Sequence, residues 1–187
     1  MNLIVSDKER MKNIVKYQIR QLEHDKNYHT DIVAFSLPKR MTHITLHLAK
    51  YAYEIAKVVE HNKSSKSFVD AFIMVVSASN LLKIELADLR VDSQSNDSPV
   101  FLDNYLKNLA TLSKACESYD HFEKYSYHDK WNEAVRNLYL SFIIQSSVMN
   151  IDVIDEANKR LDEVDSFINT GDISLKLKKK LVELDEE

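Results

Sequence analysis

The chain has 187 residues, and its 25 lysines and arginines against 29 aspartates and glutamates give a formal net charge of −4 at pH 7. It contains one glycine, Gly171, and two prolines, Pro38 and Pro99, where average usage would give roughly a dozen glycines and about nine prolines. P-loops, dinucleotide-binding fingerprints and nucleophile elbows need several glycines and are excluded. An all-β fold is disfavoured because its turns draw on glycine and proline. We therefore predict an all-α protein.

The charge distribution and the apolar runs also limit the partners. The charges are spread without a dominant basic face, which gives no support to duplex nucleic-acid binding. The longest nearly apolar stretch, Ala71 to Leu82, is too short to span a bilayer, and the first residues lack the pattern of a signal peptide. The single cysteine, Cys116, cannot form an internal disulfide and suits a reducing compartment. We expect a cytoplasmic protein without a membrane partner.

Hydrophobic periodicity divides the first half into three expected helices. A capping-box spacing followed by helical periodicity predicts a first helix over 6–24. Residues 25–40 are interpreted as an ordered loop with one short turn, in which Pro38 opens the next helix. That helix, to about residue 61, carries an apolar stripe and a polar stripe at the same period. After a polar turn, a helix that is apolar almost all round is expected over 68–89, which indicates a central position.

The second half repeats this order after a polar stretch near the middle of the chain. Helical patterns are expected over 102–122 and 131–149, separated by a turn. Asp152 is a candidate cap for a shorter helix that ends near residue 168. Gly171 and the residue after it end that helix and begin a last, solvated helix.

The two halves look alike, and this similarity suggests an architecture. Residues 47–85 and 112–152 each contain a polar-striped helix, a turn and a mostly apolar helix that closes in Leu-Lys-Ile-Glu or Met-Asn-Ile-Asp. Duplication is one interpretation, and chance similarity between two amphipathic hairpins is the other. Two such hairpins pack economically as an antiparallel four-helix core. We predict a single domain over 1–187, with hairpins at about 41–90 and 99–150, a linker at 91–98, and peripheral helices at 6–24 and 152–184.

The order of elements resembles a known enzyme family. A polar-striped helix, a polar turn and a buried helix ending in an Ile-acid pair are followed by a capped helix that begins IDVIDEANKRLDEV. Over roughly Met41 to Val164, or over each half separately, this pattern is similar to the MazG-like all-α nucleoside triphosphate pyrophosphohydrolases. That family has Glu-Glu-x-x-Glu on one helix and Glu-x-x-Asp at the start of the next, and together these motifs hold magnesium.

The resemblance implies metal ligands in the first hairpin. Glu54 matches the last glutamate of the first motif, and Asp70 matches the aspartate of the second. Tyr51 and Ser67 stand where the family has carboxylates. The first hairpin therefore keeps part of the motif.

The second hairpin is incomplete in a different way. Glu117, Asp120 and Glu133 are available, but Arg136 and Asn137 occupy the region of the closing aspartate. Carboxylates three or four residues apart share one helix face, so two facing helices can bring them to one Mg²⁺ cluster that binds phosphates and activates water. The alternative is that these acids belong to ordinary solvated faces. The candidate Mg²⁺ ligands are Glu54, Asp70, Glu117, Asp120 and Glu133, and no catalytic residue is assigned.

Three further side chains are candidates for substrate binding. Lys50 and Lys114 occupy like places in the two hairpins and can meet a phosphate, although single lysines on polar faces are usually solvated. His47 lies four residues after His43, a spacing that also suits a transition metal, but no glutamate lies between them as in zincins. The candidate substrate-binding residues are Lys50, Lys114 and His47.

Two short His-Asp pairs call for a separate interpretation. His24 with Asp25, and His128 with Asp129, spell the pair used by helical metal phosphohydrolases. Both fall in predicted turns and lack clear partner histidines, so neither is expected to form such a site.

Two functional hypotheses follow. The first is a Mg²⁺-dependent pyrophosphohydrolase that converts a nucleoside triphosphate to monophosphate and pyrophosphate. The second is a catalytically inactive relative that serves as a helical nucleotide-binding or protein-interaction module. The expected partner is a nucleotide, and a homodimer is a further expectation.

Overall fold

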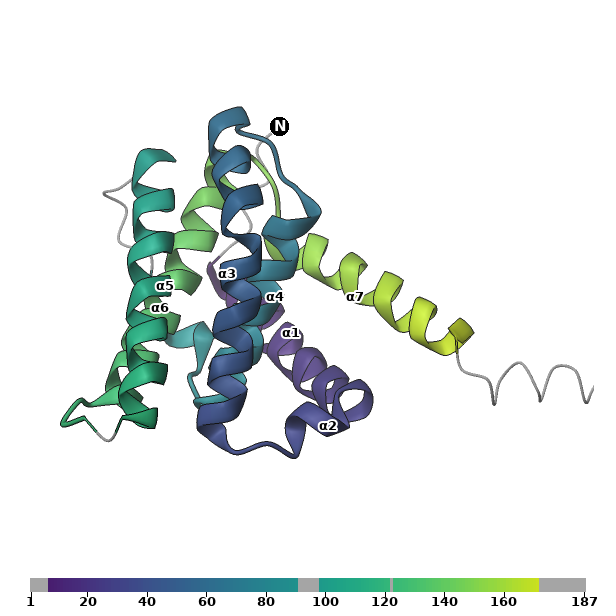
Figure 1. Ribbon diagram of the computed structural model, residues 1–187. Coiled ribbons are helices and arrows are strands. Elements are labelled where there is room, and N and C mark those ends of the chain that lie inside the picture. Colours follow the sequence, from purple (N-terminus) through teal and green to yellow (C-terminus); the bar gives the residue numbers. More distant parts are fainter. Residues whose placement is uncertain (1–6, 91–97, 122, 172–187) are drawn as a thin grey trace, which may run out of the picture.

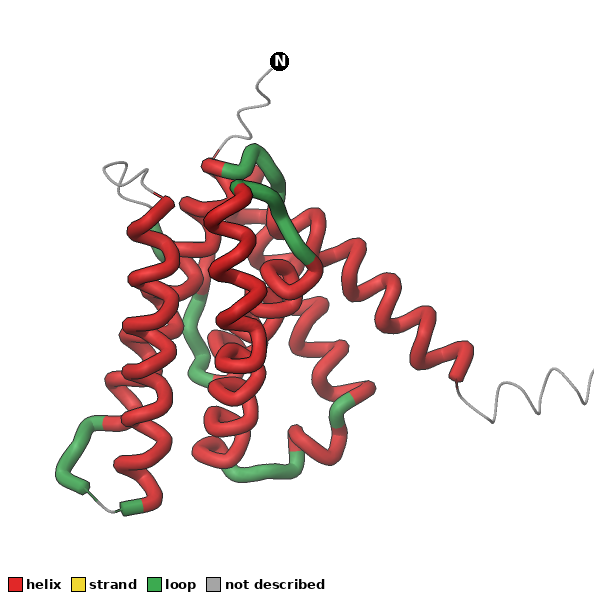
Figure 2. Tube along the Cα trace, turned by 45° about the horizontal axis from the view of Figure 1, so that its top comes forward, coloured by secondary structure: helices red, strands yellow, loops and turns green. Residues whose placement is uncertain are grey.

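The fold is entirely helical within the residues that the structure describes. A computed structural model describes residues 7–90, 98–121 and 123–171, and these residues form seven α-helices, one short 3₁₀ helix and no strand (Figure 2). The prediction of an all-α protein is confirmed. The helices are α1 (Asp7–Tyr28), α2 (Thr30–Val33), α3 (Leu37–His61), α4 (Lys66–Leu81), the 3₁₀ helix η1 (Leu86–Asp88), α5 (Ser98–Asp120), α6 (Tyr127–Val148) and α7 (Val153–Gly171).

The first helix is longer than the sequence indicated. α1 ends at Tyr28 and not near residue 24, and the four-residue α2 follows in the segment expected to be a loop with one short turn. One tertiary contact stabilises the extension: the Asp25 carboxylate accepts a hydrogen bond from Ser77 Oγ on α4 at 2.5 Å. Within α1 it also accepts one from Gln21 Nε2 at 2.8 Å. The Ser77 contact holds the end of α1 against α4.

α3 and α4 form the first hairpin. Pro38 lies in the first turn of α3, where its missing N–H costs nothing, as predicted. α3 ends at Asn62, which adopts the left-handed conformation with φ 47°. Ser65 caps α4 by accepting a hydrogen bond from the Phe68 N–H at 3.2 Å. α4 contacts α1, α3, α6 and α7, which explains why its sequence is apolar almost all round.

The end of α4 corrects the expected helix over 68–89. α4 stops at Leu81, Lys83 adopts a left-handed conformation with φ 58°, and the chain turns into η1. The Gln18 side chain of α1 forms two hydrogen bonds with the backbone after this turn. Its Nε2 donates to the Ile84 carbonyl at 2.9 Å, and its Oε1 accepts from the Leu86 N–H at 3.0 Å. The carbonyls at the end of α4 are satisfied locally, by the Lys83 N–H to Asn80 O at 3.3 Å and the Ile84 N–H to Ser79 O at 2.8 Å, and Gln18 holds the segment that follows.

α5 and α6 form the second hairpin, which lies beside the first in Figure 1. α5 packs on α3, and α6 packs on α4. The Tyr105 hydroxyl donates to the Leu48 carbonyl at 2.7 Å. Phe142 lies at the centre of an aromatic cluster, with ring centroids 4.8 Å from Phe68 and 5.3 Å from Phe101. Burial of these rings joins the two hairpins into one core.

α7 leaves the bundle at an angle. Asp152 caps it, as predicted, by accepting hydrogen bonds from the Ile154 and Asp155 N–H groups at 3.0 and 3.1 Å. The helix crosses α4 and the far half of α1, and its last turns project from the bundle (Figure 1). The last helix expected from the sequence lies outside the described residues.

Candidate functional site

A cavity of about 220 Å³ lies where α7 crosses the first hairpin. Its walls come from α1, α2, α3, α4 and α7, and the second hairpin contributes no lining residue. A single buried water needs only roughly 10–15 Å³, so the cavity has room for a small organic molecule. Four of the seven histidines of the chain line it: His24, His29, His43 and His47.

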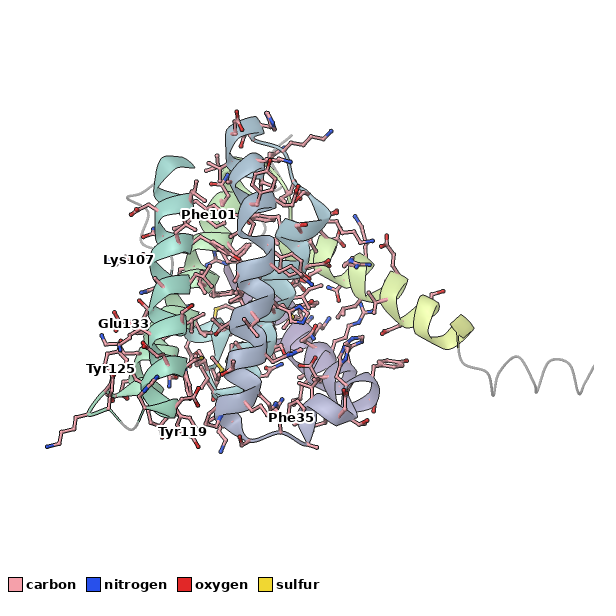
Figure 3. The ribbon with its side chains drawn as sticks, in the orientation of Figure 1. Phe35, Phe101, Lys107, Tyr119, Tyr125 and Glu133 are labelled. Atoms are coloured by element: carbon pink, nitrogen blue, oxygen red, sulfur yellow. The ribbon has the colours of Figure 1, made fainter. Side chains whose placement is uncertain are left out.

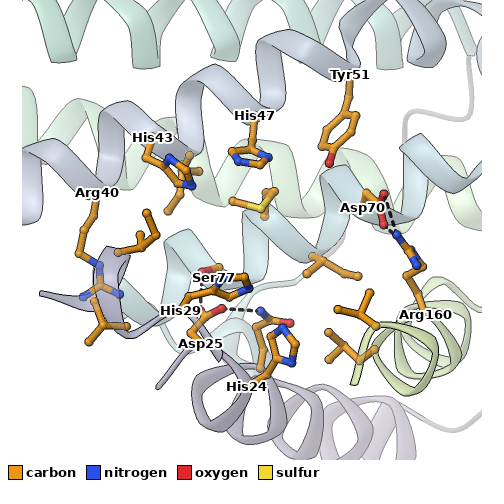
Figure 4. Close-up of a pocket in the computed structure, with 18 residues that line it drawn as sticks. His24, Asp25, His29, Arg40, His43, His47, Tyr51, Asp70, Ser77 and Arg160 are labelled. Atoms are coloured by element: carbon orange, nitrogen blue, oxygen red, sulfur yellow. Dashed lines mark hydrogen bonds and ion pairs between the residues drawn. The ribbon is translucent and has the colours of Figure 1, made fainter. Parts of the chain in front are cut away.

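One wall consists of a polar row on α3. Arg40, His43, His47 and Tyr51 follow one another at spacings of three, four and four residues, which places them on one helix face. All four side chains point into the cavity in Figure 4. The ring centroids of His43 and His47 are 4.6 Å apart, and those of His47 and Tyr51 are 6.3 Å apart. The row is therefore continuous.

The opposite wall holds polar groups that are already paired. The Asp25 carboxylate accepts hydrogen bonds from Ser77 and Gln21, as described above. His24 is buried, and its Nδ1 lies 2.7 Å from Oδ1 of Asp165 on α7. These contacts join α1, α4 and α7 around the cavity.

An ion pair closes the Tyr51 end of the cavity (Figure 4). Arg160 of α7 donates from Nε to Asp70 Oδ1 at 2.7 Å and from Nη2 to Asp70 Oδ2 at 3.5 Å. Each of the two side chains is only 20% exposed. Arg160 also lies 3.3 Å from Glu163 through Nη1. Asp70 was a candidate metal ligand, and here its charge is balanced by an arginine.

The Arg40 end of the cavity differs in charge. Within the described part of the chain, no carboxylate pairs with the Arg40 guanidinium. Burial lowers the pKa of His47, and the nearby Lys50, His43 and His29 lower it further, because each disfavours a second positive charge. An unpaired cation beside closely spaced imidazoles attracts an anion.

The other candidate metal ligands lie outside the cavity. Glu54 is 3.5 Å from Lys57, Glu117 is 2.9 Å from Lys114, and Glu133 is 2.7 Å from Lys130. Asp120 is exposed at the end of α5. Figure 3 shows Glu133 on the α5–α6 side of the molecule, away from α7.

These positions do not fit a magnesium cluster. Among residues 7–90, 98–121 and 123–171, no group of three or more histidine, cysteine, aspartate or glutamate side chains is placed to hold a metal ion. A Mg²⁺ site needs carboxylates that are close together and open to the ion, whereas four of the five candidates contact lysine or arginine. The structure therefore gives no basis for a step through Mg²⁺.

Of the three candidate substrate-binding residues, His47 alone lines the cavity. Lys50 is exposed, with Nζ 3.4 Å from His47 Nδ1 and 4.6 Å from the Tyr51 ring centroid. Lys114 is exposed in the second hairpin and pairs with Glu117 and Glu123. The two lysines therefore lie on different surfaces.

Several lining residues are not among the candidate site residues predicted from the sequence. Arg40 lies three residues before His43 and continues the polar stripe of α3, so its position was detectable from the helical period. His24 and Asp25 lie inside α1 and not in the predicted turn, and both line the cavity. Arg160 belongs to α7, and no local signal brings it to Asp70, ninety residues earlier. His128 and Asp129 lie in the first turn of α6 and do not line the cavity.

Comparison with known proteins gives no family: no family model matches the chain, and no curated protein or solved structure matches it. None of the described helices is both long enough and apolar enough to cross a membrane.

Proposed function

We propose that this protein binds a nucleotide in the cavity between the first hairpin and α7, without metal-dependent hydrolysis. The observation that carries the proposal is the Arg40 guanidinium, which has no carboxylate partner among the described residues and lies beside His43 and His47 in a cavity with a large apolar share of its lining. Apolar side chains from α2, α3, α4 and α7 make up much of the lining: Ile32, Val33, Ile44, Ile73, Met74, Leu161 and Val164.

This composition suits a ligand with an anionic end and a flat, partly apolar body. Ligand sites in proteins are concave and mainly apolar, with a few polar groups that fix the orientation of the ligand. Arg40, His43 and His47 can donate hydrogen bonds to phosphate oxygens. The rings of Tyr51 and the histidines provide faces for an aromatic base. A nucleotide has both features.

The resemblance to MazG-like enzymes supports the same location. That family places its site between the two helices of one hairpin, and the cavity lies along α3 and α4 with Asp70 in its lining. The carboxylates that such enzymes use for metal are replaced or paired here. A binding protein that has lost the metal chemistry accounts for both facts.

Hydrolysis of a nucleoside triphosphate with Mg²⁺ is the second candidate, and Asp70 is the observation that favours it. Asp70 matches the closing aspartate of the family motif and lines the cavity. For Mg²⁺ to bind there, Arg160 would have to release Asp70, and further carboxylates would have to approach.

Calorimetric titration of the full chain with a panel of nucleoside mono-, di- and triphosphates separates the two candidates. We expect binding in EDTA, with little change when Mg²⁺ is added, and no release of pyrophosphate from triphosphates. Binding that requires Mg²⁺, together with pyrophosphate release that Asp70→Asn abolishes, would establish the enzyme. Lack of binding by every nucleotide under both conditions would overturn the proposal.

Two further parts of the account are proposals. Duplication of the hairpins is supported by their matching order and by the packing of α3 on α5 and α4 on α6. A cytoplasmic location is supported by Cys116, a buried free thiol. The homodimer expected from the sequence also stays a proposal.

A further inference from the structure

We infer that the two ends of the cavity differ, so that the ligand binds in one orientation. Its phosphate lies at Arg40, His43 and His47, and its base lies beside Tyr51 and the Asp70–Arg160 pair. This inference rests on the proposed function and adds the orientation of the ligand. It further assigns a phosphate subsite that works without a metal ion.

The charges at the two ends of the cavity differ. At the Arg40 end, a guanidinium without a carboxylate partner among the described residues lies one helical turn from two imidazoles whose ring centroids are 4.6 Å apart and whose planes are tilted by 59°. At the other end, the Arg160 charge is balanced by Asp70 at 2.7 Å. An anion binds more favourably at the Arg40 end, because there it does not compete with a carboxylate that already pairs with the arginine.

Two acids on the α1 and α7 sides of the cavity are held by groups other than the α3 row. The Asp25 carboxylate lines the cavity and accepts hydrogen bonds only from neutral groups, Ser77 and Gln21, so we assign the phosphate to the α3 wall, where Arg40 lies. Asp165 is held by His24 at 2.7 Å and by Arg20 at 3.8 Å. The lining also contains His29 on the opposite side and the Asp70–Arg160 ion pair at the far end. His29 adds a further hydrogen-bond donor toward a bound phosphate.

The spacing along α3 limits where the two ends of a nucleotide can lie. Arg40 and Tyr51 are eleven residues apart on one helix, about 16 Å along its axis, whereas His47 and Tyr51 are only four residues apart, or about 6 Å. A mononucleotide with its base beside Tyr51 therefore places its phosphate next to His47 and His43, and the Arg40 side chain has to reach toward them. Tyr51 is half-buried, and the Lys50 ammonium covers its ring at 4.6 Å.

The orientation is testable by comparing ligands that lack one of the two ends. Titration calorimetry in EDTA measures the affinity of a nucleoside 5′-monophosphate, of the corresponding nucleoside and of inorganic phosphate for the full chain. We expect Arg40→Gln to weaken binding of the monophosphate about tenfold or more while the affinity for the nucleoside changes by less than about twofold. Tyr51→Leu should weaken the nucleoside and the monophosphate by the same factor.

Matched variants distinguish loss of a ligand contact from a change in net charge or a loss of folding. Lys39 is the residue before Arg40, it is exposed, and its ammonium lies over the Phe35 ring at 3.7 Å outside the cavity. Lys39→Gln removes the same charge and should leave all affinities unchanged. Arg40→Lys should keep part of the preference for the monophosphate over the nucleoside. Thermal unfolding and circular dichroism confirm that each variant is folded before its affinity is compared.

The outcomes separate the orientation from the proposed function. If the wild-type chain binds the monophosphate and Arg40→Gln binds it equally well, the orientation is overturned and nucleotide binding stands. If Arg40→Gln weakens nucleoside and monophosphate alike, the phosphate is not at this end, and the orientation is again overturned. If inorganic phosphate binds through Arg40 but no nucleoside or nucleotide binds, the subsite is supported and the proposed function fails. Absence of all binding overturns both.

Discussion

Asp70 and Arg160 are ninety residues apart in the chain, yet their side chains form an ion pair of 2.7 Å that joins α4 to α7. The pair has two consequences. It balances the acid that the resemblance to MazG-like enzymes marks as a metal ligand, and it holds α7 as a wall of the cavity. The arrangement of α7 therefore determines what the site can bind.

Removal of Arg160 should destabilise the protein measurably. Arg160→Met leaves the Asp70 carboxylate largely buried without its partner, and we expect a loss of about 1–3 kcal/mol in the free energy of unfolding. Urea denaturation followed by circular dichroism measures this change. The neighbouring Lys159 is 61% exposed, and among the described residues it pairs with Asp155 and Glu156 of its own helix alone. Lys159→Met should cost about 0.5 kcal/mol or less, and equal effects of the two variants would contradict the assigned role of Arg160.

The aromatic cluster should dominate the stability of the core. Phe142 is fully buried and contacts rings from α4 and α5. Phe142→Ala should lower the free energy of unfolding by about 3–5 kcal/mol, because it removes buried area and leaves a cavity. Tyr53 is 69% exposed, and Tyr53→Ala should change stability by less than about 0.5 kcal/mol. If Phe142→Ala lowered the free energy of unfolding as little as Tyr53→Ala, that result would contradict the packing described for the two hairpins.

Stability should depend on pH through His47. Burial, and then Lys50, His43 and His29, lower the pKa of His47 in the folded protein below its usual value of 6.5. Between the two pKa values the unfolded chain binds more protons, so the contribution of His47 is present above pH 6.5 and is lost as the pH falls through the folded pKa. The difference in unfolding free energy between pH 7.5 and pH 5.5 should shrink in His47→Gln. An unchanged difference in that variant would show that His47 does not carry this dependence.

The four exposed acids should be dispensable for ligand binding. Glu54→Gln, Glu117→Gln, Asp120→Asn and Glu133→Gln alter side chains outside the cavity, three of them in surface ion pairs. We expect each variant to bind nucleotides with an affinity within about twofold of the wild type, because surface pairs contribute little and lie far from the ligand. A loss of binding that depends on Mg²⁺ in any of them would restore the metal site implied by the resemblance.

The sequence predicted features that depend on local periodicity. The all-α class, Pro38 in the first turn of α3 and the Asp152 cap follow from patterns within a few residues of each other. The polar row of α3 was also visible, and extending it by one turn from His43 would have found Arg40. These features needed no information about tertiary contacts.

Features determined by long-range contacts were missed. α1 extends past residue 24 because Asp25 packs against Ser77, fifty-two residues later. α4 ends early at the left-handed Lys83, and Gln18, more than sixty residues earlier, holds the chain after this turn at Ile84 and Leu86. The pairing of Asp70 with Arg160 depends on the angle at which α7 crosses α4, and no helical period contains that angle. The candidate metal ligands follow from a resemblance in motif spacing, and that spacing contains no information about the lysines and arginine that pair with four of them.

Ligand binding in this cavity is tested most directly through the seven histidines. Four line the cavity, and His61, His121 and His128 are exposed outside it. NMR spectra of the imidazole rings, recorded in EDTA while a nucleoside monophosphate is added, report on each histidine separately. The account predicts saturable shifts of the His43 and His47 resonances, with those of His61, His121 and His128 unchanged. Shifts confined to the three exposed histidines, or no shifts at all, would contradict nucleotide binding at this site.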